Sequence, residues 1–134
     1  IKVVEVKKDA KDDIEINENI IEEVLDKLTL FEANKDFLIK KITLNSLSKK
    51  LETNPKYLSK IINFYKQKSF NNYINDLRIE YIINKIKTEH VFKKYSIKAL
   101  AFEAGFNNSQ SFSQFFYKKT GIYPSYFIKQ LNKD

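Results

Sequence analysis

Apolar residues recur through this chain at spacings of three and four, which is the periodicity of helices that bury one face. The longest such stripe follows Ser69 and contains large apolar residues up to Ile86. Glycine and proline occur only twice each, so polar caps rather than helix breakers separate most of the stripes. The pattern predicts an all-α protein of about seven or eight helices.

Residue types that cap helices precede the apolar stripes. Asn19 with Glu22 three residues later is a capping-box pattern, and it predicts the start of the first helix. Asn54-Pro55 is a strong start signal, because asparagine caps a helix and proline tolerates the first helical position. The other predicted starts are Thr43, Ser69, Ser96, Asn107 or Asn108, and Tyr123-Pro124.

Two segments of the chain share one layout of apolar and small residues. Their first halves match at an offset of 53 residues, with Leu44, Leu47, Ser48 and Leu51 corresponding to Ile97, Leu100, Ala101 and Ala104. Their second halves match at an offset of 54, with Leu58, Ser59, Ile62, Phe70 and Tyr73 corresponding to Phe112, Ser113, Phe116, Pro124 and Phe127. Each segment has the order helix, tight turn, helix, which predicts two helix-turn-helix units of the kind that presents a helix to DNA.

These elements divide the chain into a linker or tail at 1–16, an N-terminal helix at 17–35 and a DNA-binding domain at 36–134. In the last part we expect the first helix-turn-helix at about 43–66, a linker helix at about 69–88, the second helix-turn-helix at about 96–120 and a final helix at about 124–132. The N-terminal helix either docks on the first unit or pairs with a second copy and couples to a signal. Its stripe is short for a free-standing coil, which favours docking.

Charge and composition narrow the function. Residues 1–35 have a net charge of −4 and residues 36–134 a net charge of +11, which favours a polyanionic partner for the larger part. The absence of cysteine and the single histidine, His90, argue against zinc, and we expect no metal or cofactor. Because no nucleophile motif or phosphate loop is present, we do not expect an enzyme.

Residues 36–134 resemble the DNA-binding domain of the AraC/XylS family of bacterial transcription regulators. The resemblance rests on the order and spacing of Asn54-Pro-Lys-Tyr-Leu-Ser-Lys60, Leu77-Arg-Ile79, Gly105-Phe106 and Gly121-x-x-Pro124. It implies two helix-turn-helix units, joined by a linker helix, that insert two recognition helices into successive major-groove segments. The chain departs from the family pattern at Gln67 (usually glycine), at Gln114 and Ile128 (frequently arginine), and at Tyr123 (commonly threonine).

The resemblance also implies the setting of this domain. We expect the cytoplasmic output domain of a regulator, with a double-stranded DNA operator as its partner and RNA polymerase as a further partner. Because the sequence begins at Ile1 rather than Met, we expect an upstream sensor or receiver domain outside it.

The polar faces of the two second helices provide the expected base contacts, and a solvated helix face is the alternative interpretation of these residues. They are Lys56, Ser59, Lys60 and Asn63 in the first unit, and Ser109, Gln110, Ser113 and Gln114 in the second. Phosphate contacts are expected from helix N-termini and nearby lysines, namely Ser46, Lys66, Lys68, Ser96, Lys98, Lys118 and Lys119. We expect Arg78 to be structural, pairing with an acid such as Glu103 or capping a carbonyl.

The balance of side chains predicts an A·T-rich operator. The chain has a single arginine, so the bidentate arginine–guanine contact is scarce, whereas amide side chains can pair with adenine. Two other classes remain as alternatives: an all-helical protein-interaction module that meets an acidic partner, and a peripheral membrane binder. The second would need a continuous apolar face and would make membrane contact, which we do not expect of this domain. No apolar run reaches the roughly 20 residues that span a bilayer.

Overall fold

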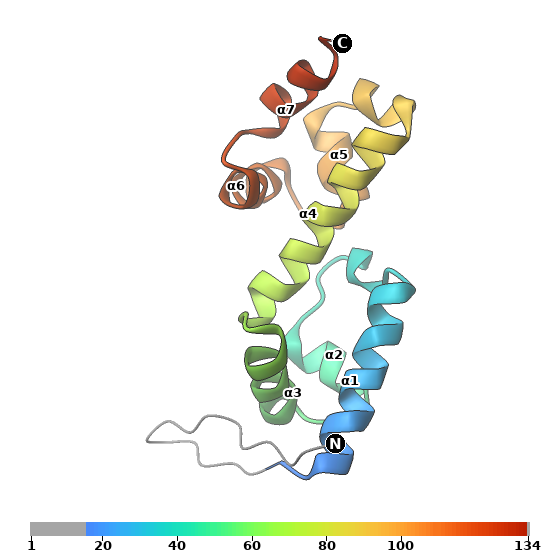
Figure 1. The fold of residues 1–134 in the computed structure, drawn as a ribbon, viewed down its shortest axis with the longest axis vertical. Coiled ribbons are helices and arrows are strands. Elements are labelled where there is room, and N and C mark those ends of the chain that lie inside the picture. The colour runs from blue at the N-terminus through green and yellow to red at the C-terminus, as the bar shows by residue number, and fades with distance from the viewer. Residues whose placement is uncertain (1–15, 134) are drawn as a thin grey trace. The chain divides into compact units, whose positions relative to one another are not determined.

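The computed structural model describes residues 16–133, and every regular element in that range is helical (Figure 1). The described chain forms two compact units. The first unit contains the residues up to Asp36 together with Ile42–Tyr73, and the second contains Phe37–Lys41 and the residues from Ile74 onward. The predicted all-α fold is confirmed, whereas the predicted linker or tail lies almost entirely outside the described residues.

The first unit is built on helices α1 (Glu18–Ala33), α2 (Leu44–Lys50) and α3 (Pro55–Ile61). Helix α3 continues into a π-helical turn, η2 (Ile62–Lys66), and α4 (Phe70–Thr88) then begins in this unit and continues into the second. The stripe of α1 is buried and α1 contacts α3. This stripe consists of Ile21, Val24, Leu28 and Phe31.

The first helix begins earlier than its sequence predicts. Asn17, not Asn19, is the N-cap, and its side chain accepts a hydrogen bond from the backbone N–H of Asn19 at 2.7 Å. The prediction of a capping box from Asn19 to Glu22 is therefore wrong. The physical reason is the pair Ile16 and Ile21, which are both buried and occupy the two positions of a hydrophobic staple around an Asn17 cap.

The second unit contains the short 3-10 helix η3 (His90–Lys94) and helices α5 (Ile97–Glu103), α6 (Ser109–Thr120) and α7 (Pro124–Leu131), packed with most of α4. Phenylalanine rings form a continuous series through its core. The ring centroids of Phe106 and Phe112 lie 5.6 Å apart, those of Phe112 and Phe116 5.8 Å, and those of Phe116 and Phe127 5.4 Å. Edge-to-face packing at these distances adds to the stability that burial provides.

Arg78 on α4 attaches the segment Phe37–Lys41 to the second unit. Its Nε donates to the carbonyl of Phe37 at 2.6 Å and its Nη2 donates to the carbonyl of Ile39 at 2.7 Å. Burial lowers the pKa of Arg78 to about 10, which still leaves it protonated near neutral pH. Of the two predicted roles, carbonyl capping is the one that the structure shows.

Candidate nucleic-acid interface

The turns of the two helix-turn-helix units have the same hydrogen bonds. In the first turn Glu52 N–H donates to the Lys49 carbonyl at 3.1 Å and Thr53 N–H to the Ser48 carbonyl at 2.9 Å. The bonds of the second turn are Gly105 N–H to Phe102 and Phe106 N–H to Ala101, both 3.0 Å long. Every donor and acceptor is shifted by the offset of 53 residues found in the sequence. The repeat is therefore structural as well as sequential.

Left-handed backbone also occurs at equivalent positions in the two units. Glu52 has a φ of 59° where Gly105 has 90°, and Gln67 has 56° where Gly121 has 84°. Glycine adopts this conformation without strain, whereas glutamate and glutamine do so at a cost. The first unit thus holds two side chains in positions that the second unit gives to glycine.

The two candidate recognition helices have the same length and the same type of cap. Residues 55–66 (α3 with η2) correspond to residues 109–120 (α6) at an offset of 54. Asn54 accepts from the N–H of Tyr57 at 2.9 Å, and Asn108 accepts from the N–H of Ser111 at 2.8 Å. The predicted choice between Asn107 and Asn108 is thereby resolved. The repeat could have resolved it, since Asn54 and Asn108 differ by the same 54 residues.

The predicted base-contacting residues lie outside the buried stripes of these helices. In the first helix the buried residues are Leu58, Ile61 and Ile62, and in the second they are Phe112 and Phe116. Lys56, Asn63, Gln110 and Gln114 are exposed, and Ser59, Lys60, Ser109 and Ser113 are partly exposed. Each recognition helix therefore presents its four predicted residues on polar surface. What they contact remains a prediction.

The predicted phosphate-contacting residues fall into three groups: lysines at the surface, serines that cap helices, and two lysines that are paired with carboxylates. Lys98 and Lys118 are exposed, and Lys68 is partly exposed. The hydroxyl of Ser96 caps α5 by accepting from Ala99 N–H at 3.0 Å, and the hydroxyl of Ser46 accepts from Thr43 N–H at 2.9 Å. Both serines therefore already have hydrogen-bond partners within the protein, as helix-capping residues do.

Lys66 and Lys119 are each paired with a carboxylate from another helix. The Nζ of Lys66 lies 3.4 Å from Glu32 Oε2, and the Nζ of Lys119 lies 3.0 Å from Glu80 Oε2. The sequence gives no sign of these pairs, because the partners are separated by long stretches of chain and meet only after the helices pack. Glu32 and Glu80 are residues near the candidate interface that the sequence analysis does not single out.

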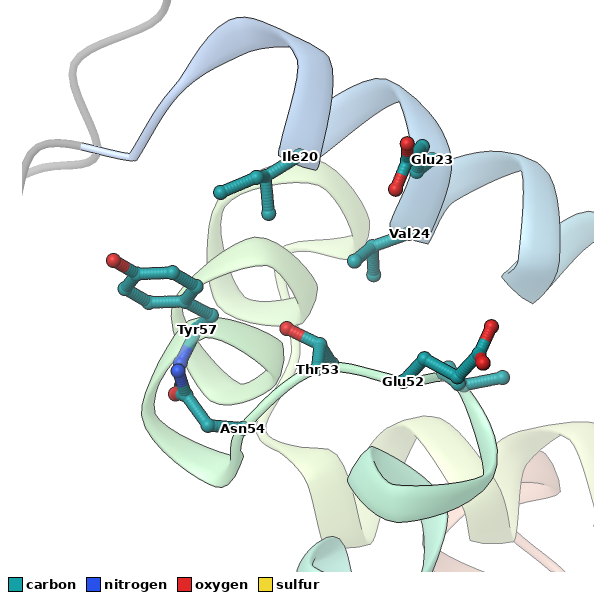
Figure 2. A pocket seen from close by; sticks show the side chains of 8 residues that line it. Ile20, Glu23, Val24, Glu52, Thr53, Asn54 and Tyr57 are labelled. Atoms are coloured by element: carbon teal, nitrogen blue, oxygen red, sulfur yellow. The ribbon is translucent and has the colours of Figure 1, made fainter.

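A cavity of about 330 Å³ lies beside the first recognition helix, between α1 and the turn that precedes α3 (Figure 2). Ile20 and Val24 line it from α1, and Thr53, Asn54 and Tyr57 line it from the turn and the start of α3. Its lining is thus distinct from the predicted DNA-contacting residues. Elsewhere in the described residues no cluster of His, Cys, Asp or Glu is suited to hold a metal, and none of the described helices could cross a membrane.

Solved structures share this fold. The C-terminal domain of AraT, a response regulator from Geobacillus stearothermophilus, is 24% identical over 83% of this chain and 84% of its own, with a TM-score of 0.66. A DNA-binding transcriptional dual regulator from Escherichia coli K-12 is 18% identical over 89% and 97%, with a TM-score of 0.64. An AraC-type DNA-binding-domain transcriptional regulator from Chromobacterium violaceum is 17% identical over 85% and 96%, also at 0.64. No curated protein matches the chain.

The repeated turns and matched caps define a double helix-turn-helix domain. Residues 47–130 match a family of helix-turn-helix domains, and this match covers more than half of the sequence. The chain belongs to that family, and its AraC type, which the sequence resemblance predicts, is confirmed. It is a DNA-binding domain of the kind found in transcription regulators.

Proposed function

We propose that this domain binds double-stranded DNA in a sequence-specific manner and that each recognition helix reads one of two successive major-groove segments. The observation that supports this most directly is the equivalence of the two units, whose turns have the same bonds and whose recognition helices have the same length. Two copies of one groove-reading device in one chain suit an operator with two short elements. The elements would lie about one helical turn apart.

The residues that would read bases are the eight predicted ones on the two polar faces, and the phosphate contacts would come from the lysine and serine set around them. The net charge of +11 in residues 36–134 provides the sequence-independent attraction that such binding needs. The domain would act as the output part of a bacterial regulator in the cytoplasm. AraT, with which it shares its fold, is a response regulator, which supports an upstream receiver or sensor domain, and RNA polymerase would be a further partner.

A salt titration against random duplex DNA tests this function against a protein-interaction module. The logarithm of the affinity should fall steeply with the logarithm of salt concentration, because several lysines displace condensed counterions. The matched control is a duplex of the same length made from a nucleic-acid analogue with an uncharged backbone, and it should bind weakly. A flat salt dependence with DNA would favour an acidic protein partner instead.

The operator should be A·T-rich at the positions that are read directly. Asn63, Gln110 and Gln114 are exposed on the recognition helices, and their amides can pair with adenine N6 and N7. Selection of bound sites from a random duplex library of balanced composition measures this preference without the bias of a genome. Enrichment of G·C at most contacted positions would contradict the amide argument.

Substitutions in the two recognition helices should have different signatures. Gln114→Ala should weaken binding to the selected site by about 1–3 kcal/mol and leave random DNA nearly unchanged, because an amide reads a base edge. Lys60→Ala should weaken both, because a lysine serves phosphate as well as bases. Gln130→Ala on α7 is the matched control and should change neither. Equal losses on both DNAs for Gln114→Ala would show that it does not read bases.

A further inference from the structure

Each recognition helix ends near a lysine that is held by a carboxylate. Lys66 lies in η2 and pairs with Glu32 of α1, and Lys119 lies in the last turn of α6 and pairs with Glu80 of α4. Both lysines belong to the set expected to contact phosphate. The first pair lies within the first unit and the second within the second unit. A lysine near the end of a recognition helix is therefore paired with a carboxylate in each unit, although Lys66 and Lys119 are not at equivalent positions of the repeat.

Glu32 is held firmly in its position. The hydroxyl of Tyr73, a residue that is only 3% exposed, donates a hydrogen bond to the same Oε2 that faces Lys66. The Nζ of Lys66 also lies 5.8 Å from the centroid of the Tyr73 ring. Burial, and then the bond to Glu32, raise the pKa of Tyr73, so the hydroxyl remains a donor at all ordinary pH values. Tyr73 thus keeps the carboxylate in front of the lysine.

A carboxylate and a DNA phosphate make the same demand on a lysine, since both present anionic oxygens that accept its N–H groups. A lysine that already pairs with a carboxylate gains less from a phosphate, because the first contact must be shared or broken. We propose that Glu32 and Glu80 act as intramolecular competitors of DNA phosphate and lower the affinity of the domain for DNA. This inference rests on the proposed function.

The two competitors differ in the helix that carries them. Glu80 lies on α4, which is continuous with the core of the second unit, whereas Glu32 lies near the end of α1. The buried stripe of α1, which contacts α3, fixes Glu32 opposite Lys66.

Neutral isosteres of the two carboxylates test the inference. Glu32→Gln and Glu80→Gln should each bind random duplex DNA about two- to fivefold more tightly, which is the range expected for a partly exposed ion pair. The slope of log affinity against log salt should become steeper by up to about 0.9 for each released lysine. Glutamine retains an oxygen that can accept from Tyr73, so we expect the first unit to stay folded.

A matched control separates competition from a general gain in positive charge. Glu52→Gln removes the same charge from a pair with Lys27, whose Nζ lies 3.0 Å from Glu52 Oε1, and Lys27 is not among the expected phosphate contacts. Its effect should be smaller than that of Glu32→Gln. In a Lys66→Ala background, Glu32→Gln should lose its advantage, and Glu80→Gln should lose its advantage in a Lys119→Ala background.

The outcomes are distinguishable. Equal gains for Glu32→Gln and Glu52→Gln, or a gain that survives Lys66→Ala, would overturn the inference for the first unit. A weaker affinity for Glu32→Gln would show instead that Glu32 positions Lys66 for phosphate. If Glu32→Gln unfolds, Glu80→Gln decides alone, because the Glu80 side chain is 55% exposed and its loss should leave stability unchanged. Failure of the wild-type chain to bind DNA would reject the proposed function rather than this inference.

Discussion

Replacement of Arg78 with leucine should lower the free energy of unfolding by about 2–5 kcal/mol. Arg78 is 8% exposed, and its guanidinium donates to the carbonyls of Phe37 and Ile39. Leucine fills much of the volume but leaves both carbonyls without this donor. The hydrogen bond to Phe37 is buried, and an unsatisfied buried acceptor is costly. Urea denaturation of the wild type and the variant, followed by circular dichroism, measures the difference.

Two further substitutions test whether the lost hydrogen bonds to the carbonyls cause this loss of stability. Arg78→Lys keeps the charge but offers one donor group in place of a fork, so it should recover only part of the loss. Lys94→Leu removes an exposed cation from the same unit and should change stability by no more than about 0.5 kcal/mol. A loss for Arg78→Leu no larger than that of Lys94→Leu would show that the carbonyl bonds contribute little.

The helices and their starts were largely predictable because their causes are local in sequence. The caps at Thr43, Asn54, Ser69 and Ser96 all accept the expected backbone hydrogen bonds. A cap and the apolar residues behind it lie within one or two turns, so a short window of sequence contains the whole signal. The repeat added long-range information, because equal spacing in two segments predicts equal structure.

The exceptions have causes that such a window cannot contain. The start of α1 was predicted two residues too late because Asn17 and Asn19 are both suitable caps. The burial of Ile16 favours the cap at Asn17. The pairs Lys66–Glu32 and Lys119–Glu80 depend on which helix faces pack together. The left-handed conformation of Glu52 and Gln67 could have been predicted from the repeat, since their counterparts at the same offsets are the two glycines.

The candidate site was predictable as a surface but not as a set of contacts. The spacing of apolar residues identifies which side of each recognition helix faces away from the core, and the exposed positions agree with it. Whether a given side chain on that side reaches a base or a phosphate depends on how the duplex lies against it. The sequence of the protein alone does not contain that geometry.

Gly105→Ala should be among the most destabilising single substitutions in the second unit. Gly105 has a φ of 90°, and a Cβ at this position would lie 2.8 Å from the carbonyl oxygen of Leu38 and 3.1 Å from Nε of Arg78. The left-handed conformation costs about 1–2 kcal/mol for alanine, and a clash with backbone adds about 1–3 kcal/mol. We therefore expect a loss of about 2–5 kcal/mol in the free energy of unfolding.

Gly121→Ala is the matched control, since it has the same conformational cost without the close contact. Its φ is 84°, and nothing lies within 4 Å of a Cβ built there. Its loss should be confined to about 1–2 kcal/mol, and the difference between the two variants measures the packing of Gly105 against the segment Phe37–Lys41. Equal losses would show that this segment moves aside to accommodate the methyl group.

Gly105 and Arg78 both lie against the segment Phe37–Lys41, so the effects of their substitutions on the free energy of unfolding should not add. Gly105 allows the segment Phe37–Lys41 to approach α5 closely, and this approach places the carbonyls of Phe37 and Ile39 within reach of Arg78. Once either residue is replaced and the segment has shifted, replacement of the other should cost less than it does alone. A double-mutant cycle of Arg78→Leu and Gly105→Ala tests this, and strict additivity would contradict it. Two of the segments by which the chain resembles its family, Leu77-Arg-Ile79 and Gly105-Phe106, would then be two halves of a single contact with Phe37–Lys41.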